Sequence, residues 1–288
     1  MLESPAYSHR MKCQTSRARV PVGPSNMTTS VQTSKKRVRW VKIPDAIRVM
    51  TEQYGPFEAE PRLDPVHELV FTILSQHTSD INSARAFRFL MEEFGSLEAV
   101  ARGEVAVIEK AISPGGLAKV KAPRIKLVLT RILELNGALD LSFLREMPLN
   151  EAKAWLRQLP GIGPKSAGII LSFSLGMPAM AVDTHIYRVC QRLRFIGPKV
   201  TVEKAHDILE AKVPPEQVFQ FHVAIINHGR RVCKAQRPLC AECVVAEGCP
   251  SRTKMMKAAA TKKSTAKPGK AANKSKRSAP VMPHVPAD

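Results

Sequence analysis

Apolar residues recur at three- and four-residue intervals through most of the chain between Pro44 and about Ala246. This spacing gathers them on one face of a helix, and Gly or Pro residues separate one such segment from the next. Alternation of apolar and polar positions, which would indicate strands, is scarce. Helices are predicted over residues 44–55, 64–76, 79–95, 97–103, 104–113, 121–137, 150–159, 164–176, 183–195, 201–213 and 215–229. No heptad persists, so the pattern predicts an all-α globule rather than a coiled coil.

The composition fits a globular protein, because 44% of the 288 residues are hydrophobic and can form a substantial core. No apolar run reaches the roughly 18 residues that span a bilayer, and no charged-then-apolar signal segment opens the chain. We therefore expect no membrane association and an intracellular protein.

Positive charge is concentrated at the two ends of the chain. The formal net charge is +19, and residues 1–40 hold eight Lys/Arg and one acid, while residues 251–288 hold ten Lys/Arg and one acid. Both segments lack apolar periodicity, so they are predicted to be disordered. Mobile basic tails favour a polyanionic partner, because neutralising phosphates releases counterions. The alternative is a pair of solvated extensions without function.

Six cysteines fall into one cluster and two isolated positions. Cys233, Cys240, Cys243 and Cys249 form C-x6-C-x2-C-x5-C within seventeen residues. This distribution favours metal ligation over a disulfide framework. Four thiolates in one compact loop suit a [4Fe–4S] cluster or a zinc ion, and the spacing alone slightly favours zinc. Cys190 is expected to be a buried small side chain, and Cys13 lies in the N-terminal tail.

The stretch "LPGIGPKSAG", from Leu159 to Gly168, predicts a tight hairpin between two helices. Gly161 and Gly163 permit the turn, and Pro164 presets the first turn of the second helix. Such a hairpin directs unpaired amide N–H groups outward, where they can hold a DNA phosphate without reading a base. A simple structural turn is the alternative.

Lys165 stands just inside the second helix, where the positive potential of the helix start favours a neutral, nucleophilic amine. It would attack an electrophilic sugar carbon and form a Schiff base, or it would only add a phosphate contact. Asp183, in "VDTHIYRV", precedes another amphipathic helix and would be an ordinary N-cap, with Thr184 as an alternative. Near Lys165, its carboxylate would instead stabilise positive charge on a sugar ring. Spacing in the sequence does not bring the two together.

These motifs, in the order "LPGIGPKSAG", "AVDTHIYRVCQRL" and "HGRRVCKAQRPLCAECVVAEGC", resemble the endonuclease III branch of the helix-hairpin-helix DNA glycosylases over residues 44–250. The resemblance implies that Lys165 is the nucleophile and Asp183 its catalytic partner. It also implies that the four clustered cysteines hold a [4Fe–4S] cluster with a mainly structural role, which reverses the slight preference for zinc.

The resemblance further implies a bifunctional enzyme of base excision repair, which removes oxidised pyrimidines from duplex DNA and cuts the strand at abasic sites by β-elimination. Related adenine-mismatch glycosylases lack a lysine at this position. Two alternatives stay open: a glycosylase for mismatched or methylated bases on the same scaffold, and a non-catalytic DNA-binding protein that uses only the hairpin and tails.

An enzyme that extrudes a base must fill the gap left in the duplex. The usual filling glutamine of the family aligns with His77, while Gln76 stands one residue earlier, so either side chain is a candidate. Leu117 is the expected second wedge, behind two glycines. Lys234 and Arg237, between the first two clustered cysteines, are expected to contact phosphates. The alternative for all five is an ordinary structural or solvated residue.

The expected protein is a monomer of two helical lobes with the active site in the cleft between them. Residues 65–180 would form a helical barrel that carries the hairpin, and residues 41–64 with 181–250 would form the lobe with the cluster. In a bacterium we expect a cytoplasmic, nucleoid-associated enzyme. Residues 1–40 are rich in Arg and Ser and poor in acids, so organellar or nuclear targeting stays open.

Overall fold

The computed structural model describes residues 40–57 and 63–257, which belong to one compact unit. The expectations for residues 1–39 and 258–288 lie outside the described residues. No helix within the described ranges is long and apolar enough to cross a membrane.

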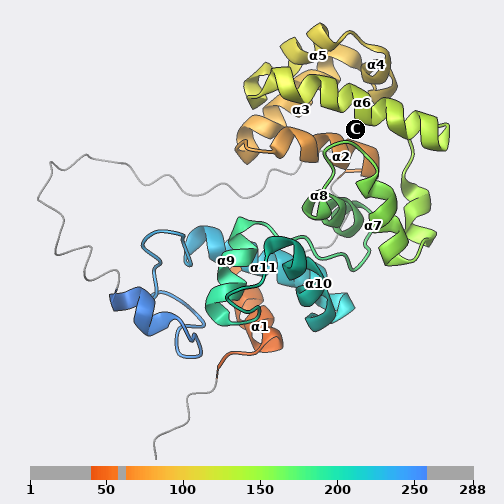
Figure 1. Ribbon diagram of the computed structural model, residues 1–288. Coiled ribbons are helices and arrows are strands. Elements are labelled where there is room, and N and C mark those ends of the chain that lie inside the picture. Colours follow the sequence, from red (N-terminus) through yellow and green to blue (C-terminus); the bar gives the residue numbers. More distant parts are fainter. Residues whose placement is uncertain (1–39, 58–62, 258–288) are drawn as a thin grey trace, which may run out of the picture. The chain divides into compact units, whose positions relative to one another are not determined.

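The described residues form helices and turns and contain no strand, which confirms the predicted all-α class (Figure 1). The α-helices are α1 (Ile43–Tyr54), α2 (Pro65–Ser75), α3 (Asp80–Phe94), α4 (Leu97–Arg102), α5 (Val105–Ile112), α6 (Ala118–Asn136), α7 (Leu149–Arg157), α8 (Pro164–Ile169), α9 (Thr184–Leu193), α10 (Val202–Lys212) and α11 (Val218–Arg231). Short turns are η1 (Ser113–Gly115), η2 (Ser142–Glu146), η3 (Ile170–Ser174) and η4 (Pro215–Gln217).

Local sequence chemistry explains where these helices start and stop. Asp64 caps α2 by accepting hydrogen bonds from the backbone N–H groups of Val66 and His67, and Ser79 caps α3 in the same way. These side chains satisfy amide groups that have no partner inside the helix. Gly95 ends α3 in the left-handed conformation, which costs glycine little.

Several boundaries differ from the prediction, among them the start of α11, at Val218 rather than residue 215. Helix α6 starts at Ala118 rather than residue 121, because Leu117 takes a left-handed conformation at its N-cap. The single helix expected over 164–176 ends as an α-helix at Ile169 and continues as the π-helical turn η3. Residues 252–257 are helical, so the disorder expected from residue 251 is wrong for this stretch. Met255 of this stretch lines the pocket of the clustered cysteines. Composition alone does not indicate this apolar contact.

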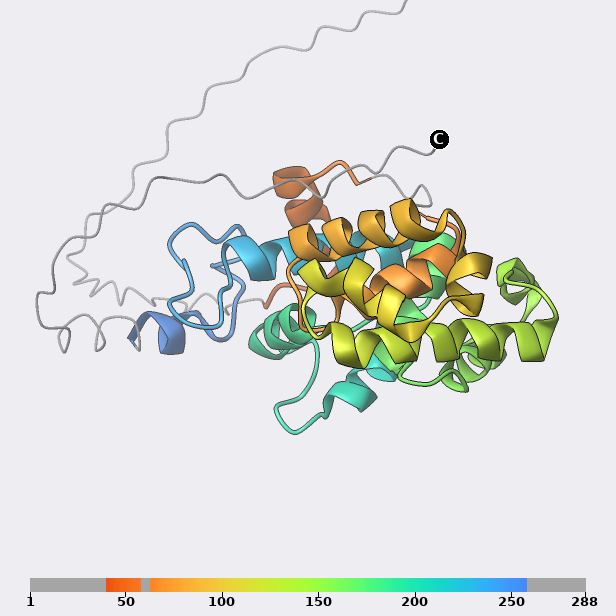
Figure 2. The ribbon, with the colours of Figure 1, turned by 90° about the horizontal axis from the view of Figure 1, so that it is seen from above.

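The buried side chains form two hydrophobic clusters. One draws on residues from Val66 to Ala179, within α2 to η3 and the segment that follows. The other combines α1 with residues from Met180 to Val245. Helices α3, α5 and α6 pack together in the first, and α11 packs on both α1 and α9 in the second, as Figures 1 and 2 show.

Candidate functional site

Lys165 lies at the start of α8, directly after the hairpin predicted from the glycines. Gly161 has a φ of +78°, in the region that favours glycine, and a β-carbon there would collide with the side chain of Arg124. Pro164 opens α8. Lys165 is the second residue of this helix and is exposed, so its amine is accessible to a ligand.

Helix α8 packs directly on the segment that leads to Asp183. A β-carbon at Gly168, three residues after Lys165, would stand 2.9 Å from the carbonyl oxygen of Met180. Only a residue without a side chain allows this approach. The contact brings the first turn of α8 close to the backbone two to three residues before Asp183, which is the proximity that sequence spacing could not supply.

Three side chains fix the backbone of residues 180–182. Glu210 accepts a hydrogen bond from the N–H of Met180 at 2.8 Å and forms an ion pair with Lys153 of α7. Two buried histidines bond neighbouring carbonyls: His206 lies 2.9 Å from Met180 O, and His222 lies 3.0 Å from Ala181 O. Because its peptide groups are bonded from α10 and α11, this segment holds Asp183 in a defined position.

Asp183 is the N-cap of α9, as one of the two sequence interpretations expected. Its Oδ1 accepts from the backbone N–H of Ile186 at 2.7 Å, and the residue is half-buried. Within the described part of the chain its Oδ2 receives no hydrogen bond. Capping therefore leaves one carboxylate oxygen available, so the structural and the catalytic roles are compatible.

His222 lies near both proposed catalytic groups. Burial lowers its pKa to about 4, while the nearby Asp183 carboxylate favours the charged form and Lys165 and Arg230 disfavour it. Its Nδ1 carries the proton that bonds Ala181 O, because a carbonyl only accepts. The ring is therefore neutral near pH 7 and holds the carbonyl group of Ala181, two residues before Asp183.

The two candidates for the gap-filling residue have different surroundings. Gln76 is half-buried and its Oε1 accepts from Arg124 at 3.0 Å. His77 is exposed, and it takes a left-handed φ of 54° that turns the chain outward. Leu117 is 54% exposed and also left-handed, with a φ of 55°. The side chains of His77 and Leu117 are thus exposed, while Gln76 is bonded within the protein.

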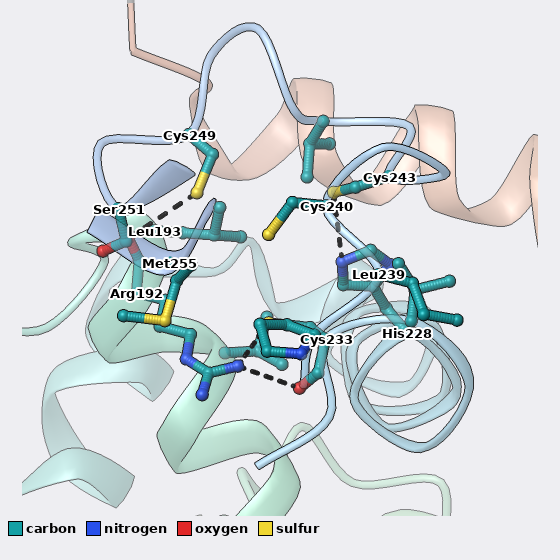
Figure 3. A pocket seen from close by; sticks show the side chains of 14 residues that line it. Arg192, Leu193, His228, Cys233, Leu239, Cys240, Cys243, Cys249, Ser251 and Met255 are labelled. Carbon is teal, nitrogen blue, oxygen red and sulfur yellow. Dashed lines mark hydrogen bonds between the residues drawn. The ribbon is translucent and has the colours of Figure 1, made fainter. Parts of the chain in front are cut away.

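Figure 3 shows the four clustered cysteines around one pocket. Apolar side chains of α9 and of the loop after α11, including Leu193 and Leu239, complete its lining. Four thiolates around one mainly apolar pocket fit the ligand set of an iron–sulfur cluster. Burial raises the pKa of Cys243 to about 11, so the thiolate needs the charge of bound iron.

Two cationic or polar side chains face the sulfur atoms of this pocket. Arg192 donates to Cys233 Sγ at 3.2 Å and to the carbonyl oxygens of Lys234 and Ala235. His228 Nε2 lies 3.6 Å from Cys243 Sγ (Figure 3). These contacts orient the cysteine side chains from outside the ligand set, which is the usual support for a metal site.

The other predicted residues have simpler surroundings. Lys234 and Arg237 are exposed on the loop between the first two clustered cysteines. Among the described residues, neither side chain has a hydrogen-bond or ion-pair partner. Cys190 is fully buried, as predicted. Sequence reasoning missed His222 and His228. Their position on α11, five to eleven residues before Cys233, was the available signal.

Comparison with known proteins agrees with this geometry. The family model of the HhH-GPD superfamily base excision DNA repair protein matches residues 70–215. The iron-sulfur binding domain of endonuclease III matches residues 233–249, which begin and end at clustered cysteines. Endonuclease III of Thermotoga maritima is 32% identical over 186 residues, covering 65% of this chain and 83% of that protein.

Two solved structures share the fold. A non-covalent endonuclease III–DNA complex matches with a TM-score of 0.65 at 27% identity and covers 75% of this chain and 97% of that one. A trapped endonuclease III–DNA covalent intermediate matches with a TM-score of 0.64 at 27% identity over 74% of this chain and 97% of that one. The chain belongs to the endonuclease III family of HhH-GPD base excision repair DNA glycosylases and carries that family's iron–sulfur domain.

Proposed function

We propose that the protein removes oxidised pyrimidines from duplex DNA and cuts the strand at abasic sites, with Lys165 as the nucleophile and Asp183 as its partner. The observation that carries this proposal is the close packing of Gly168 on the backbone of Met180 and Ala181. This contact packs α8, which carries the exposed amine of Lys165, against the segment that leads to the half-buried carboxylate of Asp183. The trapped covalent complex of the related endonuclease III supports a covalent step.

In the proposed reaction, the unprotonated Nζ of Lys165 attacks C1′ of the damaged nucleotide. The glycosidic bond breaks, and the base leaves with the bonding electrons and takes up a proton. The free oxygen of Asp183 stabilises the positive charge on the sugar during this step. The attached amine then loses a proton, the C1′–O4′ bond of the sugar ring breaks as O4′ takes up a proton, and C1′ becomes an iminium ion. Loss of a C2′ proton follows, and the 3′ phosphate leaves with the electrons of its bond to C3′ by β-elimination.

The remaining assignments follow the same geometry. Cys233, Cys240, Cys243 and Cys249 are the ligands of the [4Fe–4S] cluster, which supplies structural cross-linking rather than a step of the reaction. Gly163 has nothing within 4 Å of the position that a β-carbon would take, so a phosphate can approach its backbone. His77 and Leu117 enter the duplex, and Lys234 and Arg237 contact phosphates.

Sodium borohydride trapping on a duplex with a preformed abasic site tests the nucleophile. Wild-type protein is expected to form a covalent adduct, and Lys165→Gln to form none while keeping its helical circular dichroism. Lys110→Gln removes another exposed lysine, on α5, and is expected to trap like wild type. An adduct at the wild-type rate in folded Lys165→Gln would refute the assignment.

Substrate class is tested on a lesion panel of thymine glycol, a G·T mismatch and 3-methyladenine, each in the same duplex. Faster release of thymine glycol is the expected result. The family's usual glutamine is replaced by His77 in this chain, so the panel also tests whether that change redirects the enzyme to mismatched or methylated bases.

A further inference from the structure

Lys121 is a buried lysine of α6 whose ammonium joins two separate loops. The residue is 2% exposed, and Nζ donates to Leu74 O at 2.6 Å, to Thr78 Oγ1 at 2.7 Å and to Gly115 O at 3.3 Å. These three acceptors match the three N–H groups of an ammonium. Leu74 and Thr78 lie at the end of α2 and in the 76–79 loop, whereas Gly115 lies in the 113–117 loop.

The hydroxyl of Thr78 completes the junction. It accepts from Lys121 and donates to Gly115 O at 2.6 Å. Gly115 is itself packed on α3, because a β-carbon there would stand 2.8 Å from the Cβ of Ala86. One ammonium and one hydroxyl therefore tie the 76–79 loop to the 113–117 loop and hold both against the helices.

Each loop carries an exposed residue in a costly backbone conformation. His77 has a φ of 54° and Leu117 a φ of 55°. For a residue other than glycine this conformation costs about 1 to 2 kcal/mol and persists only where the surroundings impose it. Lys121 bonds the carbonyl groups of Leu74 and Gly115, three and two residues before these positions, and the Thr78 side chain restrains the residue after His77. This is the kind of restraint that such a conformation needs.

A buried ammonium is a poor source of stability. Burial lowers the pKa of Lys121, and none of its three acceptors is a carboxylate. The free energy lost when the ammonium gives up its hydration offsets most of the free energy gained from its hydrogen bonds. A buried charge of this kind therefore adds little to the free energy of unfolding, and its main effect is to fix the groups that it bonds in one arrangement. The arrangement that it defines is the separation of His77 and Leu117.

We propose that Lys121 is a positioning residue that sets the spacing between His77 and Leu117, so that both side chains enter an opened duplex together. The inference rests on the proposed function, in which these two residues fill the gap left by the extruded nucleotide. Lys121 touches neither the sugar nor the base. Its effect is expected on duplex opening and not on the chemistry at C1′.

The test variant is Lys121→Met, which keeps the length of the chain and removes the three hydrogen bonds. Lys126→Met is the matched control, because Lys126 lies on the same helix and donates to Gly103 O at 2.8 Å, outside both loops. Thr78→Val is a second test variant, which removes the hydroxyl and leaves the buried ammonium in place. Circular dichroism and iron content verify folding of each protein.

The first measurement is borohydride trapping on an abasic site in a duplex and on the same abasic site in a single strand. Lys121→Met should slow adduct formation on the duplex at least about tenfold, since a small misplacement of contact groups is costly. It should trap the single strand within about twofold of wild type, because no duplex needs to be opened. Lys126→Met should form the adduct at the wild-type rate on both DNAs. Thr78→Val should also slow adduct formation on the duplex, but less than Lys121→Met does.

The second measurement follows the opening of the duplex in a protein that cannot catalyse the reaction. In the Lys165→Gln background, 2-aminopurine opposite a tetrahydrofuran abasic analogue should become fluorescent on binding, and Lys121→Met should reduce that rise. Equal losses on duplex and single strand, or an unchanged fluorescence rise, would overturn the proposal for Lys121. Failure of wild-type protein to trap either DNA would instead reject the proposed function, and the fluorescence would still decide the role of Lys121.

Discussion

Gly168 and Ala181 are in backbone contact, so that a β-carbon on Gly168 would stand 3.1 Å from the Cα of Ala181. Gly168 lies one helical turn after Lys165, and Ala181 lies two residues before Asp183. The pair therefore connects the helix that carries the proposed nucleophile to the segment that carries the proposed carboxylate.

Gly168→Ala should separate these two groups. Its β-carbon would meet backbone atoms of Met180 and Ala181, which cannot rotate away as a side chain can. We expect a loss of about 1 to 3 kcal/mol in the free energy of unfolding and a fall of at least about tenfold in borohydride trapping. Gly197→Ala is the control, because its β-carbon would stand at an ordinary 3.6 Å from Val200. Wild-type trapping by Gly168→Ala would show that this contact does not set the site.

Asp183→Asn should separate capping from catalysis. The amide oxygen of asparagine can still accept from Ile186 N, so α9 should keep its start. The transition state loses a negative charge, so single-turnover release of thymine glycol should slow by about two orders of magnitude with DNA affinity retained. Thr201→Ala removes the N-cap of α10 and should cost about 1 kcal/mol of stability without slowing release. Normal release by Asp183→Asn would leave only the capping role.

The helices of this fold are largely predictable from the sequence, whereas the contacts between them are not. Periodicity and caps located α2, α3 and α9 to within one or two residues. The predicted start of α6 is three residues too late. Leu117 and Val120 are apolar but exposed, so the first turn of this helix shows no amphipathic pattern. No sequence pattern marks Lys121 as buried, and its burial depends on the loop that contains η1, which packs on α3 and accepts a hydrogen bond from its ammonium.

The same limit applies to the candidate site. Lys165, Asp183 and the clustered cysteines belong to motifs with fixed local spacing, so the sequence and its family resemblance located them. Glu210 of α10 and His222 of α11 bond the backbone of the 180–182 segment, and no spacing rule in the sequence connects these three parts. The proposal of His77 rather than Gln76 likewise rests on Arg124, 48 residues further along the chain, which bonds Gln76.

The clustered cysteines predict the iron content of the protein. Anaerobically purified protein should be yellow-brown and hold about four irons per chain. Cys243→Ser should lose most of this iron, because it removes a sulfur that lines the pocket. Cys190→Ser is the matched control, since Cys190 is buried in the same hydrophobic cluster but does not line the pocket. Stoichiometric zinc without iron, or equal iron in the two variants, would contradict the assignment.

The C-terminal segment predicts a salt-dependent contribution to DNA binding. Residues 258–288 contain seven Lys/Arg and one acid, and a cut after Lys257 keeps the helical turn that contributes Met255 to the cysteine pocket. Deletion should weaken binding to undamaged duplex and flatten the dependence of log K on log salt, because fewer counterions are released. The measurement is fluorescence anisotropy across a salt series. An unchanged slope would identify the segment as an extension without a role in binding.

Because His222 is buried, we expect the protein to lose stability in mild acid. Its pKa is lowered by burial from the ordinary 6.5 to about 4 in the folded protein, in a setting that includes Asp183, Lys165 and Arg230. Between these two values the unfolded chain binds a proton that the folded protein excludes. The stabilisation is therefore complete above about pH 6.5 and is lost as the pH falls towards 4, by about 2 kcal/mol at pH 5.

Urea unfolding at pH 7 and pH 5, with cluster absorbance followed to exclude loss of iron, measures this difference. His222→Gln should be less stable at pH 7, because its amide fits the site of a buried imidazole imperfectly, yet it should lose about 2 kcal/mol less than wild type on going to pH 5. The burial of His206 also lowers its pKa, and its contribution remains in both proteins and cancels in the comparison. Equal acid sensitivity in the two proteins would mean that His222 takes up its proton as readily when folded as when unfolded.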